Sequence, residues 1–268
     1  MASQLTNPKD RAINPLDIHH NPHSPFSLST PITTIFGPNP SCLLTPETTE
    51  GPFYLLGELI RSNLIEDQPN IPLHLDLLVI DTSTCLPLTD GTYIELWSAN
   101  ATGVYGGWNA PDDASNVRRS WLRGAQRLDA ETGTAQPDTI FPGHYPRRAP
   151  HVHVMVHRRG AEVLANGTIQ DAVAAHTGQL FFDQELVEEV EGRWPYVENE
   201  GELLRNEGDY YVPLASRGGN DPFVSYVFLN GRDVGDGLLG WMTVGVDMSR
   251  EVNVSVAGTF HGEQGGVL

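Results

Sequence analysis

Pro150-His-Val-His-Val-Met-Val-His157 is the stretch that decides the fold. Its three valines alternate with His151, His153, Met155 and His157, and side chains two residues apart on a strand point to the same side. The alternation predicts a strand with one apolar face against a core and a second face that carries histidines.

The same period of two recurs along the chain, between turns rich in Gly and Pro. It predicts further strands over Ile71–Asp81, Gly91–Ser98, Phe223–Leu229, Met242–Val246 and Val252–Phe260. The main helix is predicted over Phe181–Val190, where apolar and polar residues follow helical spacing. Many short strands with few helices favour a mainly β protein, either a sandwich or a barrel.

Residues 1–40 differ from the rest because they are rich in Pro, Asn, Ser and His. This composition predicts an irregular N-terminal arm that lies on the domain or is disordered. No internal repeat or second domain is visible, so residues 41–268 are predicted to form one domain.

The charge excludes some classes of function. The chain has 34 acidic and 16 basic residues, a formal charge of −18, which disfavours nucleic-acid binding. No apolar run approaches the roughly 18 residues that span a bilayer, so no membrane role is expected. Eight arginines fall within residues 118–159 against three acidic residues, a net +5. Such a region can attract a small anion, or it can be a solvated loop.

The compartment is less well defined. Cys42 and Cys85 form either one disulfide or two buried thiols. No basic start followed by an apolar stretch is seen, so a cytoplasmic location is favoured. Three glycosylation sequons, at Asn100, Asn166 and Asn253, would fit a secreted protein instead.

His151 and His153 lie on one face of the predicted strand, so two imidazoles can converge on one ion. His157 shares that face but lies roughly 20 Å from His151, and it is expected to be a surface residue. Tyr145 precedes the strand in a Pro/Gly turn, and Tyr105 lies in a Gly-rich loop after Trp97.

In combination, these segments resemble the intradiol ring-cleavage dioxygenases, and particularly their fungal members. The resemblance covers about residues 41–250 in the family's order. Its motifs are Leu44-Thr-Pro-Glu-Thr-Thr-Glu-Gly-Pro-Phe-Tyr54, Val79-Ile-Asp81, the Trp97–Tyr105 loop, Arg148–His153, His176-Thr-Gly-Gln-Leu-Phe-Phe-Asp183, Asp221-Pro-Phe-Val224 and Gly237-Leu-Leu-Gly-Trp241.

The resemblance implies a single-domain β-sandwich over residues 41–268, with a non-haem Fe(III) as cofactor. By position, the metal ligands would be Tyr105, Tyr145, His151 and His153. Phenolate oxygen is a hard anionic donor, which suits ferric rather than ferrous iron. Tyr145 would be the tyrosinate that substrate displaces, while Tyr105 stays bound.

Four further residues match family positions. Arg148 would stabilise negative charge on the substrate ring, and Gln179 would help to orient the same group. Pro52 and Phe53 would form part of the wall of the substrate pocket.

The implied activity is cleavage of an aromatic diol, of the catechol, hydroxyquinol or protocatechuate type, by O₂ to a muconate-type diacid. Two alternatives are considered: another oxidation or ring cleavage of a bulky phenolic natural product in secondary metabolism, and a metal-free, transthyretin-like binding module. The expected partners are a small aromatic diol and O₂, and a homodimer is left open.

Overall fold

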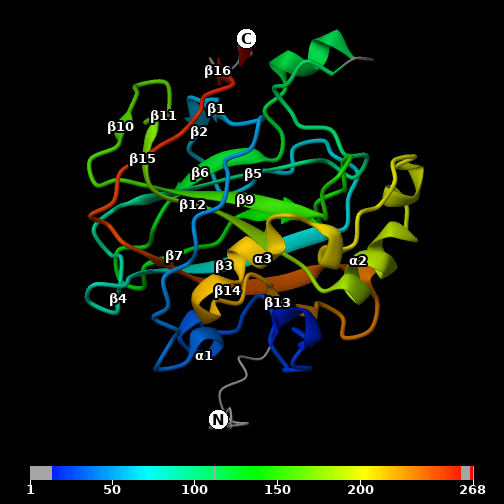
Figure 1. The fold of residues 1–268 in the computed structure, drawn as a ribbon, viewed down its shortest axis with the longest axis horizontal. Helices are drawn as coiled ribbons and strands as arrows, with labels where there is room; N and C mark the ends of the chain where they lie inside the picture. Colours follow the sequence, from blue (N-terminus) through cyan, green and yellow to red (C-terminus); the bar gives the residue numbers. More distant parts are fainter. Residues whose placement is uncertain (1–13, 111–112, 261–265, 268) are drawn as a thin grey trace, which may run out of the picture.

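Two long strands with alternating apolar residues form the centre of the molecule: β3 (Pro72–Asp81) and β9 (His151–His157). The computed structural model describes residues 14–110, 113–260 and 266–267. It places these strands in two facing sheets (Figure 1). The predicted alternation is confirmed, since the three valines of β9 and Leu73, Leu75 and Leu77 of β3 join one buried apolar cluster.

The larger sheet has six strands. Its order is β13 (Ser225–Phe228), β14 (Leu238–Val246), β3 and β4 (Leu86–Pro87), while β7 (Thr134–Ala135) and β8 (Asp138–Ile140) also pair with β3. β14 runs parallel to β3 along nine residue pairs. This long parallel pairing joins the two longest strands of the six-stranded sheet.

The second sheet carries the histidine strand. Its order is β15 (Val252–Asn253), β12 (Val173–Phe181), β9, β5 (Tyr93–Ser98) and β6 (Arg123–Arg127). Its inner face packs on the six-stranded sheet, and its outer face holds a smaller cluster that includes Trp97, Tyr105 and Met155. Both faces of β9 are therefore buried, although only one of them is apolar throughout.

Two short three-stranded sheets and several helices complete the fold. The small sheets join β1 (Leu55–Leu56), β16 (Gly258–Phe260) and β17 (Gly266–Val267), and β10 (Glu162–Val163), β11 (Thr168–Gln170) and β2 (Glu58–Leu59). The α-helices are α1 (Ile32–Phe36), α2 (Gln184–Glu191) and α3 (Val212–Ala215). Short 3-10 turns are η1 (Pro15–Asp17), η2 (Ala114–Arg118), η3 (Tyr196–Glu198), η4 (Asn206–Gly208), η5 (Arg217–Gly219) and η6 (Val234–Asp236). Within the described ranges, no helix combines the length and apolar character that a bilayer crossing requires.

The prediction of a mainly β protein is confirmed, but some element boundaries were wrong. The helix predicted over Phe181–Val190 begins only at Gln184, because Phe181 still belongs to β12 and Asp183 is the N-cap. The strand predicted over Val252–Phe260 breaks into β15 and β16. Between these two strands, the backbone N–H groups of Ser255 and Ala257 donate to Glu50 and Tyr54 rather than to a sheet partner.

The described part of the N-terminal arm lies on the sandwich. His20 is buried between Asp183 and Asp221, and its carbonyl accepts a hydrogen bond from the backbone of Tyr226. Residues 1–13 lie outside the described part of the chain, and the domain boundary near residue 41 stays a prediction.

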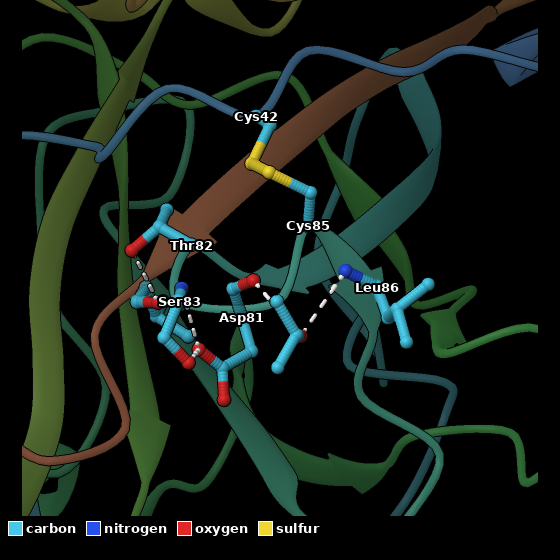
Figure 2. Close-up of a disulfide and its surroundings, with 8 residues drawn as sticks. Cys42, Asp81, Thr82, Ser83, Cys85 and Leu86 are labelled. Carbon is cyan, nitrogen blue, oxygen red and sulfur yellow. Dashed lines mark hydrogen bonds between the residues drawn. A yellow bond between two sulfur atoms is a disulfide. The ribbon is translucent and has the colours of Figure 1, made fainter.

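The segment that follows the arm is fastened at two points. Cys42 and Cys85 form a disulfide to the turn between β3 and β4 (Figure 2), which answers the question that the sequence left open. Three residues later, Thr45 exchanges two hydrogen bonds with the backbone of Gly245. A Cβ at Gly245 would lie 1.9 Å from the carbonyl oxygen of Leu43, so only glycine permits this close approach.

Candidate active site

Two phenols and two imidazoles converge on the outer face of the five-stranded sheet. His151 and His153 project from the start of β9, with Tyr145 in the turn before it and Tyr105 in the loop after β5. The Nε2 atoms of the two histidines are 3.1 Å apart, and the Tyr145 hydroxyl is 3.4 Å from Nε2 of His151. The rings of Tyr105 and Tyr145 meet edge to face at 5.4 Å. The structure thus brings together all four residues predicted as metal ligands.

The ring of His151 has a defined tautomer. Its Nδ1 lies 2.7 Å from the carbonyl oxygen of Ala149, which can only accept a hydrogen bond, so the proton is on Nδ1. The lone pair on Nε2 is then directed toward His153. Metal-binding histidines commonly donate their second ring N–H in this way.

The electrostatic environment keeps both imidazoles neutral. Burial lowers the pKa of His151 well below its ordinary value, and the Arg148 charge adds to this effect. Burial, followed by the neighbouring His151, does the same to the pKa of His153. Neutral imidazole is the form that binds metals, so the pair is in the right state for a cation.

The two phenols differ in their burial. Tyr105 is only 2% exposed, and its hydroxyl is buried without a hydrogen-bond partner among the described residues. Tyr145 is half-buried, and its hydroxyl faces His151 and Arg148. Burial raises the pKa of Tyr105 well above its ordinary value and that of Tyr145 as well, although Arg148 opposes the shift at Tyr145. A bound cation would reverse this preference and ionise both groups.

These donors fit a ferric ion. Two nitrogens that each bind one ion at about 2.1 Å lie about 3 Å apart when the angle at the metal is near 90°, which agrees with the observed pair. Among the described residues, no three His, Cys, Asp or Glu side chains converge as a metal site. The two phenols add oxygen donors to the histidine pair, and such hard oxygens suit Fe(III).

Aromatic rings hold the donors in place. Trp97 stacks on His153 at 4.9 Å and 3°, and Phe53 stacks on Tyr105 at 4.3 Å and 17°. Gly51, at φ +70°, approaches so closely that a Cβ would lie 3.1 Å from His153. Of the two residues predicted for the pocket wall, Phe53 thus contacts a candidate ligand, while Pro52 is exposed.

Arg148 lies beside Tyr145, and Gln179 contacts Arg148, while the roles of both in a reaction stay predictions. Arg148 donates from Nη1 to the Tyr145 hydroxyl at 3.3 Å and from Nη2 to Oε1 of Gln179 at 2.5 Å. Gln179 in turn donates to the carbonyl oxygen of Thr49 at 3.0 Å. Sequence reasoning missed Asp209, whose buried carboxylate accepts from Nε of Arg148 at 2.8 Å. No spacing pattern links these two residues, because Asp209 lies 61 positions away in an irregular segment.

The other end of β9 overturns one prediction. His157 was expected at the surface, but it is fully buried, and its Nε2 lies 2.9 Å from Oε2 of Glu95 on β5. The two strands pair here, so alternate residues of β5 face the histidine side of β9. The period of two that places Trp97 on this face also places Glu95 there, which is the signal that could have revealed the pair.

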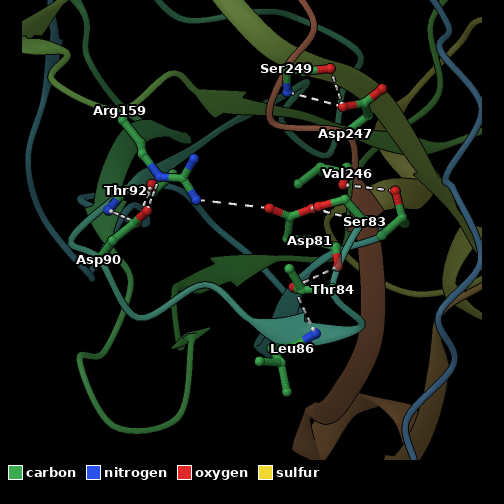
Figure 3. Close-up of polar contacts among 11 residues, drawn as sticks. Asp81, Ser83, Thr84, Leu86, Asp90, Thr92, Arg159, Val246, Asp247 and Ser249 are labelled. Atoms are coloured by element: carbon green, nitrogen blue, oxygen red, sulfur yellow. Dashed lines mark hydrogen bonds and ion pairs between the residues drawn. The ribbon is translucent and has the colours of Figure 1, made fainter.

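Four of the eight arginines of residues 118–159 lie in separate surroundings and do not share one positive patch. Arg123 is fully buried beside Glu58 and donates to the backbone carbonyls of Phe53 and Gly106. Arg158 pairs with Glu251, and Arg159 pairs with Asp90 and approaches Asp81 at 3.8 Å (Figure 3). Of these four arginines, Arg148 is the one whose side chain donates to a candidate ligand, Tyr145.

Comparison with known proteins finds relatives in sequence and in fold. A curated catechol 1,2-dioxygenase from Acinetobacter guillouiae is 30% identical over 133 residues, which cover 43% of this chain and 43% of that enzyme. The match thus spans less than half of this curated relative. A solved intradiol ring-cleavage dioxygenase from Tetranychus urticae is 29% identical, with a TM-score of 0.65, over 79% of this chain and 98% of that one. A second dioxygenase structure, at 28% identity and the same TM-score, covers 80% and 98%. No protein-family model matches the chain.

These three relatives are named as dioxygenases, and two of them as catechol or intradiol enzymes. By sequence and by fold, the chain is similar to the intradiol ring-cleavage dioxygenases. None of these relatives is named as fungal, so that part of the resemblance stays a prediction.

Proposed function

We propose that the protein is an Fe(III)-dependent intradiol dioxygenase. It cleaves an aromatic diol with O₂ between the two hydroxylated carbons and yields a muconate-type diacid. The observation that carries the proposal is the convergence of four donors around His151 Nε2 and His153 Nε2, which lie 3.1 Å apart.

Tyr105, Tyr145, His151 and His153 would hold the iron. When bound there, ferric iron supplies Lewis acidity that draws electron density from a chelated diol and orients it toward O₂. The protein's part is to fix four ligands in a largely dry environment, and the burial of Tyr105, His151 and His153 supports this role.

Tyr145 and Tyr105 would have different roles because their surroundings differ. Tyr145 is half-buried in a turn, so its side chain can move when substrate arrives, and its Oη can take a proton from a substrate hydroxyl. Arg148, at 3.3 Å, favours the anionic form of that oxygen. Tyr105 lies beneath Phe53 and would stay in place.

Arg148 would also stabilise the negative charge that develops on the ring during attack by O₂. Its Nη2 group is fixed by Gln179, and a preoriented guanidinium needs little reorganisation during the reaction. In the overall reaction one ring carbon–carbon bond breaks, and both oxygen atoms of O₂ enter the product as parts of two carboxylates.

Product analysis with isotopically labelled oxygen tests the proposal. The iron-loaded protein should convert at least one catechol, hydroxyquinol or protocatechuate to a ring-opened diacid that contains two ¹⁸O atoms from ¹⁸O₂. A product that keeps its ring, or that gains a single labelled oxygen, would contradict intradiol cleavage. Tyr145→Phe serves as the matched control, because it removes one oxygen atom and should form no diacid.

A further inference from the structure

Asp209 is the least expected charged group near the site. It lies between η4 and α3, and its side chain is fully buried. One carboxylate oxygen accepts from Nε of Arg148 and from the backbone N–H of Ala149, both at 2.8 Å, and the other accepts from the backbone N–H of Tyr211 at 2.7 Å.

A buried carboxylate needs a counter-charge, and Arg148 is the cation in contact with Asp209 within the described chain. The same oxygen holds both the Arg148 side chain and the amide of the next residue. The carbonyl oxygen of Ala149 then accepts a hydrogen bond from the Nδ1–H group of His151. One carboxylate therefore fixes the guanidinium and the backbone from which a candidate ligand is oriented.

The donors of Arg148 are divided among three partners. Of its five N–H groups, Nε faces Asp209, one on Nη2 faces Gln179 and one on Nη1 faces Tyr145. Its guanidinium carbon lies 4.5 Å from the centre of the Tyr211 ring. Asp209 and Tyr211 thus form two sides of a dock for a planar cation.

We propose that Asp209 is a positioning residue, and that together with Tyr211 it forms a guanidinium-binding dock that aims Arg148 at the reacting diol. This role rests on the proposed dioxygenase function, because Arg148 acts on the substrate. Asp209 itself makes no contact with the four donor side chains in the described contacts, so it works through Arg148 and Ala149.

Asp209→Asn tests the role with little change in shape. It should keep full iron binding and lower kcat about 10–100-fold, with a smaller change in KM, as expected for loss of a supporting partner. Glu207→Gln is the matched control, because Glu207 lies in the same segment with a side chain 74% exposed, and it should match the unaltered protein. An Asp209→Asn protein with unchanged kcat would overturn the proposal.

Chemical rescue separates positioning from mere support of the fold. Millimolar guanidinium, far below denaturing concentrations, should restore part of the rate of Arg148→Ala, since the dock remains. Guanidinium should not raise the rate of Arg148→Ala/Asp209→Asn. Sodium chloride at the same concentration should not change the rate of either variant. Equal rescue of both variants would contradict the dock.

A denaturant unfolding cycle of the metal-free protein provides a readout that does not require activity. Asp209→Asn should lower the denaturant concentration at the unfolding midpoint strongly when Arg148 is present. In the Arg148→Ala background, the same substitution should lower it much less. Additive shifts would refute the pairing. If the iron-loaded protein cleaves no diol, the proposed function fails, and this cycle still reports on the dock.

Discussion

The two ends of β9 carry histidines on the same face of one strand, yet they have opposite chemistry. His151 and His153 face phenols and Arg148, and their pKa values are lowered. His157 faces Glu95 and Asp171, whose carboxylates outweigh burial and raise its pKa to about 8. The position on the strand determines which face a histidine lies on. The neighbouring side chains determine whether its imidazole is neutral, with a free lone pair, or protonated.

Replacing a histidine at the first end should have the largest effect. His153→Ala removes a candidate ligand and should lower both iron content and ring cleavage to background. The matched control is His157→Gln/Glu95→Gln, which neutralises the buried pair at the far end without leaving a lone charge. Iron content and activity, measured together, should separate the two ends. A His153→Ala protein with full activity would refute the ligand assignment.

Arg148 is the cation that distinguishes the first end, and its loss should come next in size. Arg148→Ala should keep its iron and lose about 10²–10³-fold in kcat, as expected when a charge-stabilising donor is removed. Steady-state kinetics on the iron-loaded protein, with metal content checked, would measure this. Unchanged kinetics would remove Arg148 from the reaction.

The disulfide should affect stability without affecting either end of β9. It closes a loop over a sequence separation of 43, so Cys42→Ser/Cys85→Ser should lower the free energy of unfolding by about 4 kcal/mol. Thr45 and Gly245 still hold the next segment, so activity at low temperature should persist. Urea unfolding with a parallel activity assay checks both statements. Loss of activity in a folded variant would show that the tether shapes the site.

The smallest expected effect is the pH dependence of stability that arises from His157, at the far end of β9. The pKa of His157 is raised from 6.5 to about 8. Its contribution to the free energy of unfolding is therefore complete below pH 6.5 and is lost as the pH rises through 8. Over this range, the free energy of unfolding of the unaltered protein should fall by up to about 2 kcal/mol relative to that of His157→Gln/Glu95→Gln. His20, with a pKa raised to about 9, titrates in both proteins and cancels. Parallel pH profiles of stability would contradict the charged pair.

Local patterns predicted much of the molecule. Alternation gave the strands and the correct inner face of β9, and the ordered motifs gave the four converging donors. What escaped depends on contacts between distant segments. Asp209 meets Arg148 across 61 positions, and no periodicity connects them. The period of two places Glu95 and His157 each on one face of its own strand, but their contact across 62 positions also depends on the pairing of β5 with β9. The predicted start of α2 was wrong for a related reason, because pairing with β9 extends β12 through Phe181.

The central claim is that two phenolates and two imidazoles bind one ferric ion, and a visible-absorption titration tests it most directly. Adding Fe(III) to the metal-free protein should produce an intense tyrosinate-to-iron charge-transfer band that saturates at one equivalent. The band should weaken in Tyr105→Phe and Tyr145→Phe. A protein that binds one equivalent of iron and stays colourless would contradict the account.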